Sequence, residues 1–220
     1  MHDDEMASDA SEYWDRRREI TPSPERRFVA DGDSQLALIV DVSDSPVAEA
    51  YGRLRSDLDD FDCVRSTPRA GLHLTVKLFD RTAAEPTQAD EPAPTDDIDD
   101  AVHDIAAGHG PFEAAFPRLN VFPDTVYAEA ETDGVLSALN AALCERTWAA
   151  TSSRDAGQFV PHLTLGYLTS AEGYDRLVDF LERRRDLSFP TATVDELSLV
   201  AYDGASNWRS AATTLRTYSL

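Results

Sequence analysis

Two identical His-Leu-Thr tripeptides, at residues 73–75 and 162–164, each place an imidazole two residues before a hydroxyl. Each lies in a strand-like apolar run, GLHLTVKLF and VPHLTLGYL. Because side chains alternate along a strand, the histidine and threonine of each motif share one face, about 6–7 Å apart, and the leucines point to the other face. On paired strands, the two motifs would bring two acid–base groups and two hydrogen-bond donors to one cleft.

This set of groups suits displacement at phosphorus in a phosphodiester. The reaction needs a base on the attacking oxygen and an acid on the leaving oxygen, on opposite sides of the phosphate. His73 and His162, titrating near neutrality, can fill these roles, one neutral and one protonated. Thr75 and Thr164 can donate to the non-bridging oxygens, where charge builds up. The scheme requires no metal ion and no cofactor. The alternative is that the repeat keeps these residues by descent alone, without activity in one or both copies.

Three further residues are candidates for substrate contacts. Lys77 is the only lysine of the chain and shares the predicted face of His73 and Thr75, where it can bind phosphate or lie at the rim. Arg118 can pair with a terminal phosphate, or it is a solvated strand residue. Tyr167 can stack on a base, although strict alternation assigns it to the leucine face, and aromatic strand residues more often belong to the core.

The elements around the motifs repeat in two passages, about residues 34–122 and 123–220, with one motif at the same place in each. Helices are predicted to begin near Ser45, Thr95, Asp133 and Ser170, and strands at 36–42, 71–79, 112–122, 125–130, 160–168, 194–202 and 213–220. The sequence therefore predicts an α+β fold of two lobes, built from duplicated β-α-β-α-β repeats, with largely antiparallel sheets lining a central cleft and helices outside.

Two segments stand apart from this pattern. Residues 1–33 are charged and aperiodic, and Pro22 and Pro24 interrupt any helix that begins before them. We expect them to form a flexible acidic tail before a single domain at 34–220. Residues 83–97 (AAEPTQADEPAPTDD) carry prolines and many carboxylates, and they indicate a surface loop inserted after the first motif strand, at the rim of the cleft.

The composition is strongly acidic, with 41 Asp and Glu against 20 Lys and Arg and a formal charge of −21. Such a surface is typical of adaptation to high salt, where screening relieves self-repulsion, or alternatively of a basic partner. It disfavours a broad groove for duplex DNA, which needs many cationic phosphate contacts. Two cysteines without metal-binding spacing, no apolar signal segment and no apolar run of about 20 residues favour a cytoplasmic monomer without a membrane anchor.

At the two motifs the sequence resembles the two-histidine phosphoesterases, the superfamily of the 2′-5′ RNA ligase-like proteins and RNA 2′,3′-cyclic phosphodiesterases. Their signature is a pair of His-x-Thr/Ser-x motifs with a hydrophobic last residue, matched here by HLTV and HLTL. The ending VDELSLVAYDG…NWR is similar to the closing strands of that family. The resemblance covers about residues 35–220, and the loop at 83–97 departs from the family pattern. It implies catalytic roles for the two histidines and phosphate contacts for the two threonines.

We therefore expect a hydrolase that opens a 2′,3′-cyclic phosphate at an RNA end or on a small nucleotide, with 2′-5′ ligation as the reverse reaction. Two alternatives stay open. The same site could act on another diester, such as a cyclic mononucleotide, a 2′-5′ oligonucleotide or ADP-ribose 1″,2″-cyclic phosphate. The fold could instead bind nucleotides or RNA without turnover.

Overall fold

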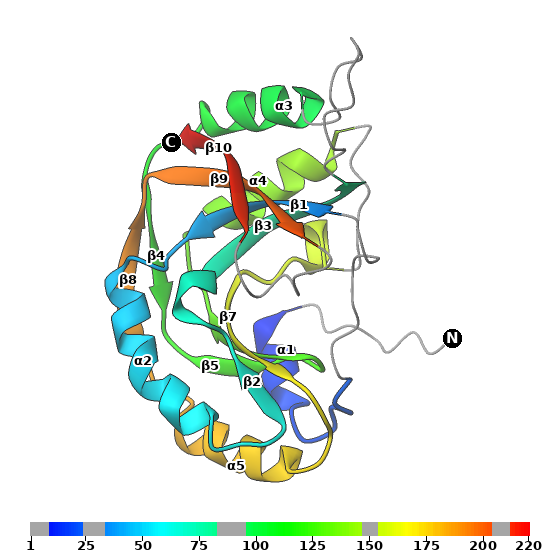
Figure 1. Cartoon of the computed structure of the whole chain (residues 1–220), viewed down its shortest axis with the longest axis vertical. Helices are drawn as coiled ribbons and strands as arrows, with labels where there is room; N and C mark the ends of the chain where they lie inside the picture. Colours follow the sequence, from blue (N-terminus) through cyan, green and yellow to red (C-terminus); the bar gives the residue numbers. More distant parts are fainter. Residues whose placement is uncertain (1–8, 24–33, 83–95, 147–153, 204–211) are drawn as a thin grey trace.

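The computed structural model describes residues 9–23, 34–82, 96–146, 154–203 and 212–220 (Figure 1). Its strands are β1 (Ser34–Asp41), β2 (Val64–Ser66), β3 (His73–Thr82), β4 (Phe112–Phe116), β5 (Leu119–Val121), β6 (Thr125–Glu129), β7 (His162–Leu168), β8 (Phe189–Val194), β9 (Glu196–Asp203) and β10 (Thr213–Ser219). Its helices are α1 (Ala10–Asp15), α2 (Pro46–Leu58), α3 (Asp96–Ala106), α4 (Val135–Cys144) and α5 (Tyr174–Arg183), with the short 3₁₀ helices η1 (Arg69–Gly71) and η2 (Ala156–Gln158). In these residues no helix is long and apolar enough to cross a membrane.

Most strands form one sheet in the order β10-β9-β1-β3-β7-β6-β5, with β2 paired to β7, while β4 and β8 form a separate ribbon. Every pairing among the described strands is antiparallel. In Figure 1, α2, α3 and α5 lie around the outside of the strands. The predicted α+β class, with antiparallel sheets and outer helices, is confirmed.

The main core lies between one face of the sheet and the outer helices. The alternating leucines of the motif strands contribute directly, because Leu74 and Leu163 are fully buried in it. The predicted apolar stripe of α2 is buried as well, from Val47 through Tyr51 and Leu54 to Leu58. The hydroxyl of Tyr51 donates to the carbonyls of Thr67 and Leu165, at 2.9 and 2.6 Å. Burying the leucines fixes which face of each motif strand is left for the histidines.

Strands from the two sequence passages are exchanged between the two ends of the sheet. The C-terminal strands β9 and β10 continue the sheet beyond β1, whereas β2 pairs with β7 and β4 with β8. The observed strand pairing therefore does not follow the predicted division into two contiguous lobes at residue 122. The local pattern indicated which residues form strands, but the choice of neighbour depends on contacts between segments far apart in the chain.

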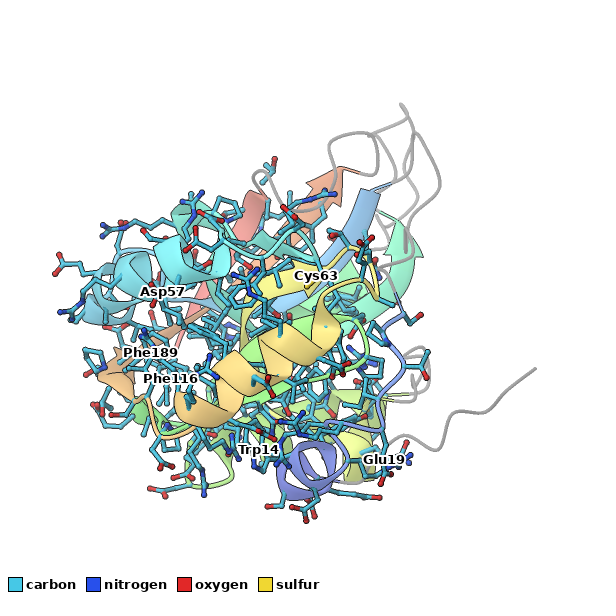
Figure 2. All side chains as sticks on the ribbon, turned by 90° about the horizontal axis from the view of Figure 1, so that it is seen from below. Trp14, Glu19, Asp57, Cys63, Phe116 and Phe189 are labelled. Atoms are coloured by element: carbon cyan, nitrogen blue, oxygen red, sulfur yellow. The ribbon has the colours of Figure 1, made fainter. Side chains whose placement is uncertain are left out.

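Part of the expected N-terminal tail is folded. Tyr13 of α1 is only 5% exposed and packs edge-on against Phe122, with ring centroids 4.6 Å apart. The side-chain amide of Asn120 donates to the carbonyl of Ala10 at 2.7 Å. Figure 2 shows α1, with Trp14 labelled, next to α5, and Arg17 forms an ion pair of 2.7 Å with Glu182 of α5. The prediction of a flexible tail is thus wrong for residues 9–23.

Several element boundaries differ from the sequence prediction. The strand expected at 112–122 is split into β4 and β5 around Pro117, which cannot donate a ladder hydrogen bond. Helices α4 and α5 begin after Gly134 and Gly173, whose φ angles of 82° and 81° favour glycine, rather than at Asp133 and Ser170. Strands β2 and β8 were not predicted. Residues 83–95 of the predicted inserted loop lie outside the described part of the chain. Its last two residues, Asp96 and Asp97, form the start of α3.

Candidate active site

The two motif strands are neighbours in the sheet. Strands β3 and β7 pair antiparallel at Leu74 and Leu163, whose side chains are buried beneath the sheet. This register puts His73 across from Thr164 and Thr75 across from His162 on the opposite face. Diagonal neighbours of this kind lie about 7–8 Å apart, so the register brings the two histidines close together on this face of the sheet. All four side chains are half-buried, and we call them the His–Thr patch.

Both imidazoles are held in the same way. Nδ1 of His73 lies 2.8 Å from the carbonyl oxygen of Gly71, and Nδ1 of His162 lies 2.8 Å from that of Val160. Because a carbonyl only accepts, Nδ1 carries the proton in each ring. Nε2 is therefore the atom that accepts a proton when neutral and donates one when charged. The backbone two residues upstream thus sets the tautomer in both motifs.

His162 lies among aromatic rings. Phe122 and Tyr127 approach it edge-on, with centroids 5.0 and 5.4 Å from the imidazole. The pKa of His162 is lowered to about 4, chiefly by burial and also by the charges of Arg154 and His73, against the opposing effects of the backbone hydrogen bond and of the nearby Asp124 carboxylate. His162 is therefore neutral at pH 7 in the free protein. The influence of His73 on this pKa also reflects how near the two motifs lie.

His73 has a more polar neighbourhood. The hydroxyl of Tyr202, on β9, lies 3.3 Å from Nε2 and donates to it while the ring is neutral. Burial lowers the pKa of His73 from its usual 6.5, while the Gly71 carbonyl and the carboxylate of Asp41 act in the opposite direction. The sequence predicted titration near neutrality for both rings. The structure differs, because burial disfavours the charged form of each.

Lys77 does not face the patch. Strand β1 pairs Ile39 with Thr75 and Leu38 with Lys77, so Val76 is an extra residue that forms a bulge in β3. After the bulge, each later side chain of β3 points to the face opposite to the one that simple alternation predicts. The Lys77 side chain is 1% exposed, and its Nζ lies 2.5 Å from a carboxylate oxygen of Asp155. The prediction that Lys77 contacts the substrate is therefore wrong. Lys77 forms an internal ion pair with Asp155 instead.

Arg118 is engaged by two carboxylates. Its guanidinium lies 3.1 Å from Glu129 and 3.1 Å from Glu131. Glu129 also accepts from Asn120 and Arg185. These ion pairs favour the alternative interpretation of Arg118 as a solvated surface residue over a contact to a terminal phosphate, and Arg118 lies between β4 and β5 and not within a strand.

Tyr167 lies on the face of the patch, contrary to simple alternation. The β6–β7 register shifts so that Tyr127 faces Thr164 and Val126 faces Gly166, which leaves Leu165 as the extra residue. The Tyr167 side chain then hydrogen-bonds to that of Thr164, and burial raises the pKa of its hydroxyl. At 5% exposure it offers no open ring for stacking on a base. It is placed to orient the Thr164 hydroxyl.

Sequence reasoning missed Tyr202, Phe122 and Arg154 as neighbours of the patch. Arg154 precedes η2, and its guanidinium carbon lies 4.9 Å from the centroid of Phe122. None of the three stands near a motif in sequence, so no local signal linked them to it. In the described part of the chain, no group of three or more His, Cys, Asp or Glu side chains is arranged to hold a metal ion.

Known proteins with this fold and with similar sequences identify the class to which this chain belongs. Residues 43–206 match the 2′-5′ RNA ligase superfamily, so the chain belongs to this superfamily of two-histidine phosphoesterases. It is 24% identical over 168 residues to the RNA 2′,3′-cyclic phosphodiesterase of Methanothermobacter thermautotrophicus, a match that covers 74% of this chain and 86% of the relative.

Solved structures show the same fold. LigT of E. coli complexed with 3′-AMP is 17% identical, with a TM-score of 0.57 over 86% of this chain and 98% of LigT. A protein of Thermus thermophilus is 18% identical, with a TM-score of 0.55 over 84% of this chain and 97% of its own. At these identities the likeness shows the architecture.

Proposed function

We propose that this protein is a metal-independent phosphodiesterase that hydrolyses a 2′,3′-cyclic phosphate, at an RNA end or on a small nucleotide, by paired-histidine acid–base catalysis. The observation that carries the proposal is the pairing of β3 and β7 at Leu74 and Leu163, which supports two imidazoles flanking one phosphate. The name of the methanogen relative, RNA 2′,3′-cyclic phosphodiesterase, and the 3′-AMP in the LigT complex agree with this substrate class.

The surroundings of the two rings favour His162 as the base. Burial and the nearby charge of Arg154 keep it neutral, so its Nε2 can take a proton from water as the water oxygen attacks phosphorus. His73, near the carboxylate of Asp41, becomes the protonated partner when the anionic substrate binds. The P–O bond to one ribose oxygen breaks, and His73 gives its proton to that oxygen. The product is a ribose phosphate monoester.

The two threonines fit a role at the non-bridging oxygens. Their hydroxyls lie next to the imidazoles in the antiparallel register, and donors at these oxygens stabilise the charge of the transition state. An RNA 5′-hydroxyl in place of water would give a 2′-5′ linkage by the same proton transfers. Ligation is therefore a minor activity of the same site in this proposal.

The decisive experiment is turnover of a panel of cyclic phosphates at high KCl by the wild type and by His73→Ala and His162→Ala. Each substitution should lower kcat by about 10²–10⁴-fold, the usual contribution of a positioned acid or base. His103→Ala, on the exposed face of α3, is the matched control and should leave turnover unchanged. Activity that survives either substitution in the patch would contradict paired catalysis.

Two further outcomes separate the alternatives. Turnover should persist in EDTA, and its loss would show that a metal ion takes part. Binding of the panel compounds without any turnover by the wild type would favour a nucleotide- or RNA-binding module. Turnover restricted to a 2′-5′ oligonucleotide or to ADP-ribose 1″,2″-cyclic phosphate would reassign the substrate while keeping the site.

A further inference from the structure

Arg154 is a cation at the edge of the His–Thr patch in a chain whose charge is strongly negative. Its guanidinium lies over the ring of Phe122, and the same ring packs edge-on against the imidazole of His162. Its NH2 forms an ion pair of 2.9 Å with Asp124, and 37% of the side chain is exposed. A positive charge here opposes the repulsion that the −21 charge of the chain imposes on an anionic substrate.

The residue after Arg154 is anchored in the interior. Asp155 accepts from Nζ of Lys77 at 2.5 Å and from the side-chain amide of Asn140 at 2.9 Å. The carbonyl oxygen of the Asn140 side chain accepts from the backbone N–H of Ala156 at 2.8 Å. Lys77 is 1% exposed and Asn140 fully buried, so these bonds are shielded from water.

The same cluster reaches the bulge of the first motif strand. Asn140 also donates to the carbonyl of Val76 at 2.8 Å, the extra residue that follows Thr75. The segment that carries Arg154 and the strand that carries His73 and Thr75 are therefore tied to one buried group of side chains. We call Lys77, Asn140 and Asp155 the anchor cluster.

We propose that Arg154 binds an anionic oxygen of the substrate next to His162, and that the anchor cluster holds Arg154 in this position. The inference rests on the proposed function for the identity of the anion, a phosphate. It assigns the lone lysine a positioning role beneath the sheet. In this proposal Arg154 touches the substrate, whereas the anchor cluster does not.

Phosphate binding tests the first half without relying on turnover. Inorganic phosphate is titrated while the ring signals of His73 and His162 are followed by NMR. Arg154→Met keeps much of the side-chain length without the charge, and it should weaken binding about tenfold or more, whereas Arg154→Lys should weaken it less. Arg184→Met is a matched control, because Arg184 also pairs with an aspartate (Asp57) and lies over a phenylalanine ring (Phe180). It should bind phosphate as the wild type does.

Kinetics distinguish contact with substrate from an indirect effect. Arg154→Met should raise KM for the cyclic phosphate much more than it lowers kcat, as expected for lost substrate binding. Unchanged phosphate affinity and unchanged KM, with only the pH profile shifted, would overturn the contact and leave Arg154 as an electrostatic neighbour of His162. A wild type that binds phosphate through Arg154 but turns over no cyclic phosphate would defeat the proposed function alone.

The anchor cluster is tested in combination with Arg154. Asp155→Asn should weaken phosphate binding, and it should add little in the Arg154→Met background, because both changes remove one interaction. Asp155→Asn leaves Lys77 buried with a neutral partner and endangers the fold. The paired variant Lys77→Met with Asp155→Asn removes both charges and supplies the same readout when the single variant does not fold. Wild-type affinity in the paired variant, or full additivity with Arg154→Met, would refute the positioning role.

Discussion

The two histidines of the patch share chemistry and backbone support but differ in their neighbours. Each donates from Nδ1 to the carbonyl two residues upstream, which leaves Nε2 for proton transfer. His162 lies against two aromatic rings, while Nε2 of His73 accepts from a tyrosine hydroxyl. Identical tripeptides therefore give unequal acid–base groups, which a reaction with one base and one acid requires.

The pH dependence follows from the lowered pKa values. In the free protein, His162 should titrate near pH 4 and His73 below its usual 6.5. The neutral base is lost as the pH falls through the pKa of His162, and the protonated acid is lost as the pH rises through that of His73. We therefore expect kcat/KM to form a bell with its maximum on the acidic side of pH 6.5.

NMR titration of the imidazole Cε1–H signals checks this directly, with His73→Ala and His162→Ala used for assignment. The exposed ring of His103 gives an internal comparison on α3. A His162 signal that titrates at or above 6.5 would contradict the desolvated environment around the ring.

At the scale of elements, two bulges decide which side chains meet. One extra residue in β3 turns Lys77 inward, and one in β7 brings Tyr167 beside Thr164. Bulges are common next to active sites, where they re-aim a side chain. Here they act directly after each threonine of the patch.

Helix α1 packs on Phe122, and the ring of Phe122 in turn contacts His162 of the patch. Tyr13 packs on that ring, so Tyr13→Ala should lower the free energy of unfolding by about 3 kcal/mol, near the low end for truncation of a buried aromatic residue. It should also shift the NMR signals of His162, because Phe122 contacts both rings. Denaturant unfolding measures the stability change.

Tyr13→Phe serves as the control, since it keeps the ring and should preserve most of the stability. If Tyr13→Ala unfolds at the same denaturant concentration as the wild type, then α1 contributes no stability. That result would favour the sequence-based prediction of a flexible tail for residues 9–23.

At the scale of the whole molecule, charge is the dominant feature. Acidic side chains outnumber basic ones by 41 to 20, and the single lysine is internal. The arginines of the described surface are largely engaged with carboxylates, among them Arg17, Arg18 and Arg184. Net repulsion therefore remains among the acidic groups, and it weakens as salt shortens the screening length.

Thermal stability should accordingly rise with salt. The screening length falls from about 10 Å at 0.1 M to about 3 Å at 1 M salt, which removes much of the repulsion between exposed carboxylates. We expect Tm to rise by several degrees over this range of KCl. A non-ionic osmolyte at equal osmolality separates screening from general exclusion effects. A Tm independent of KCl would instead favour the alternative of an acidic surface made for a basic partner.

The sequence by itself determined the motifs, the face on which each histidine lies relative to its leucine, the apolar stripe of α2 and the superfamily. The motifs, the faces and the stripe are local properties, because side-chain chemistry and the periods of strand and helix fix them. The superfamily follows from the motifs. Only the tertiary structure decided that β9 and β10 join β1, that α1 packs on Phe122, and that Lys77 meets Asp155. A one-residue bulge reverses every later position on a strand, and the pairing of distant strands depends on the packing of the complete core, so neither can be read from alternation along the chain.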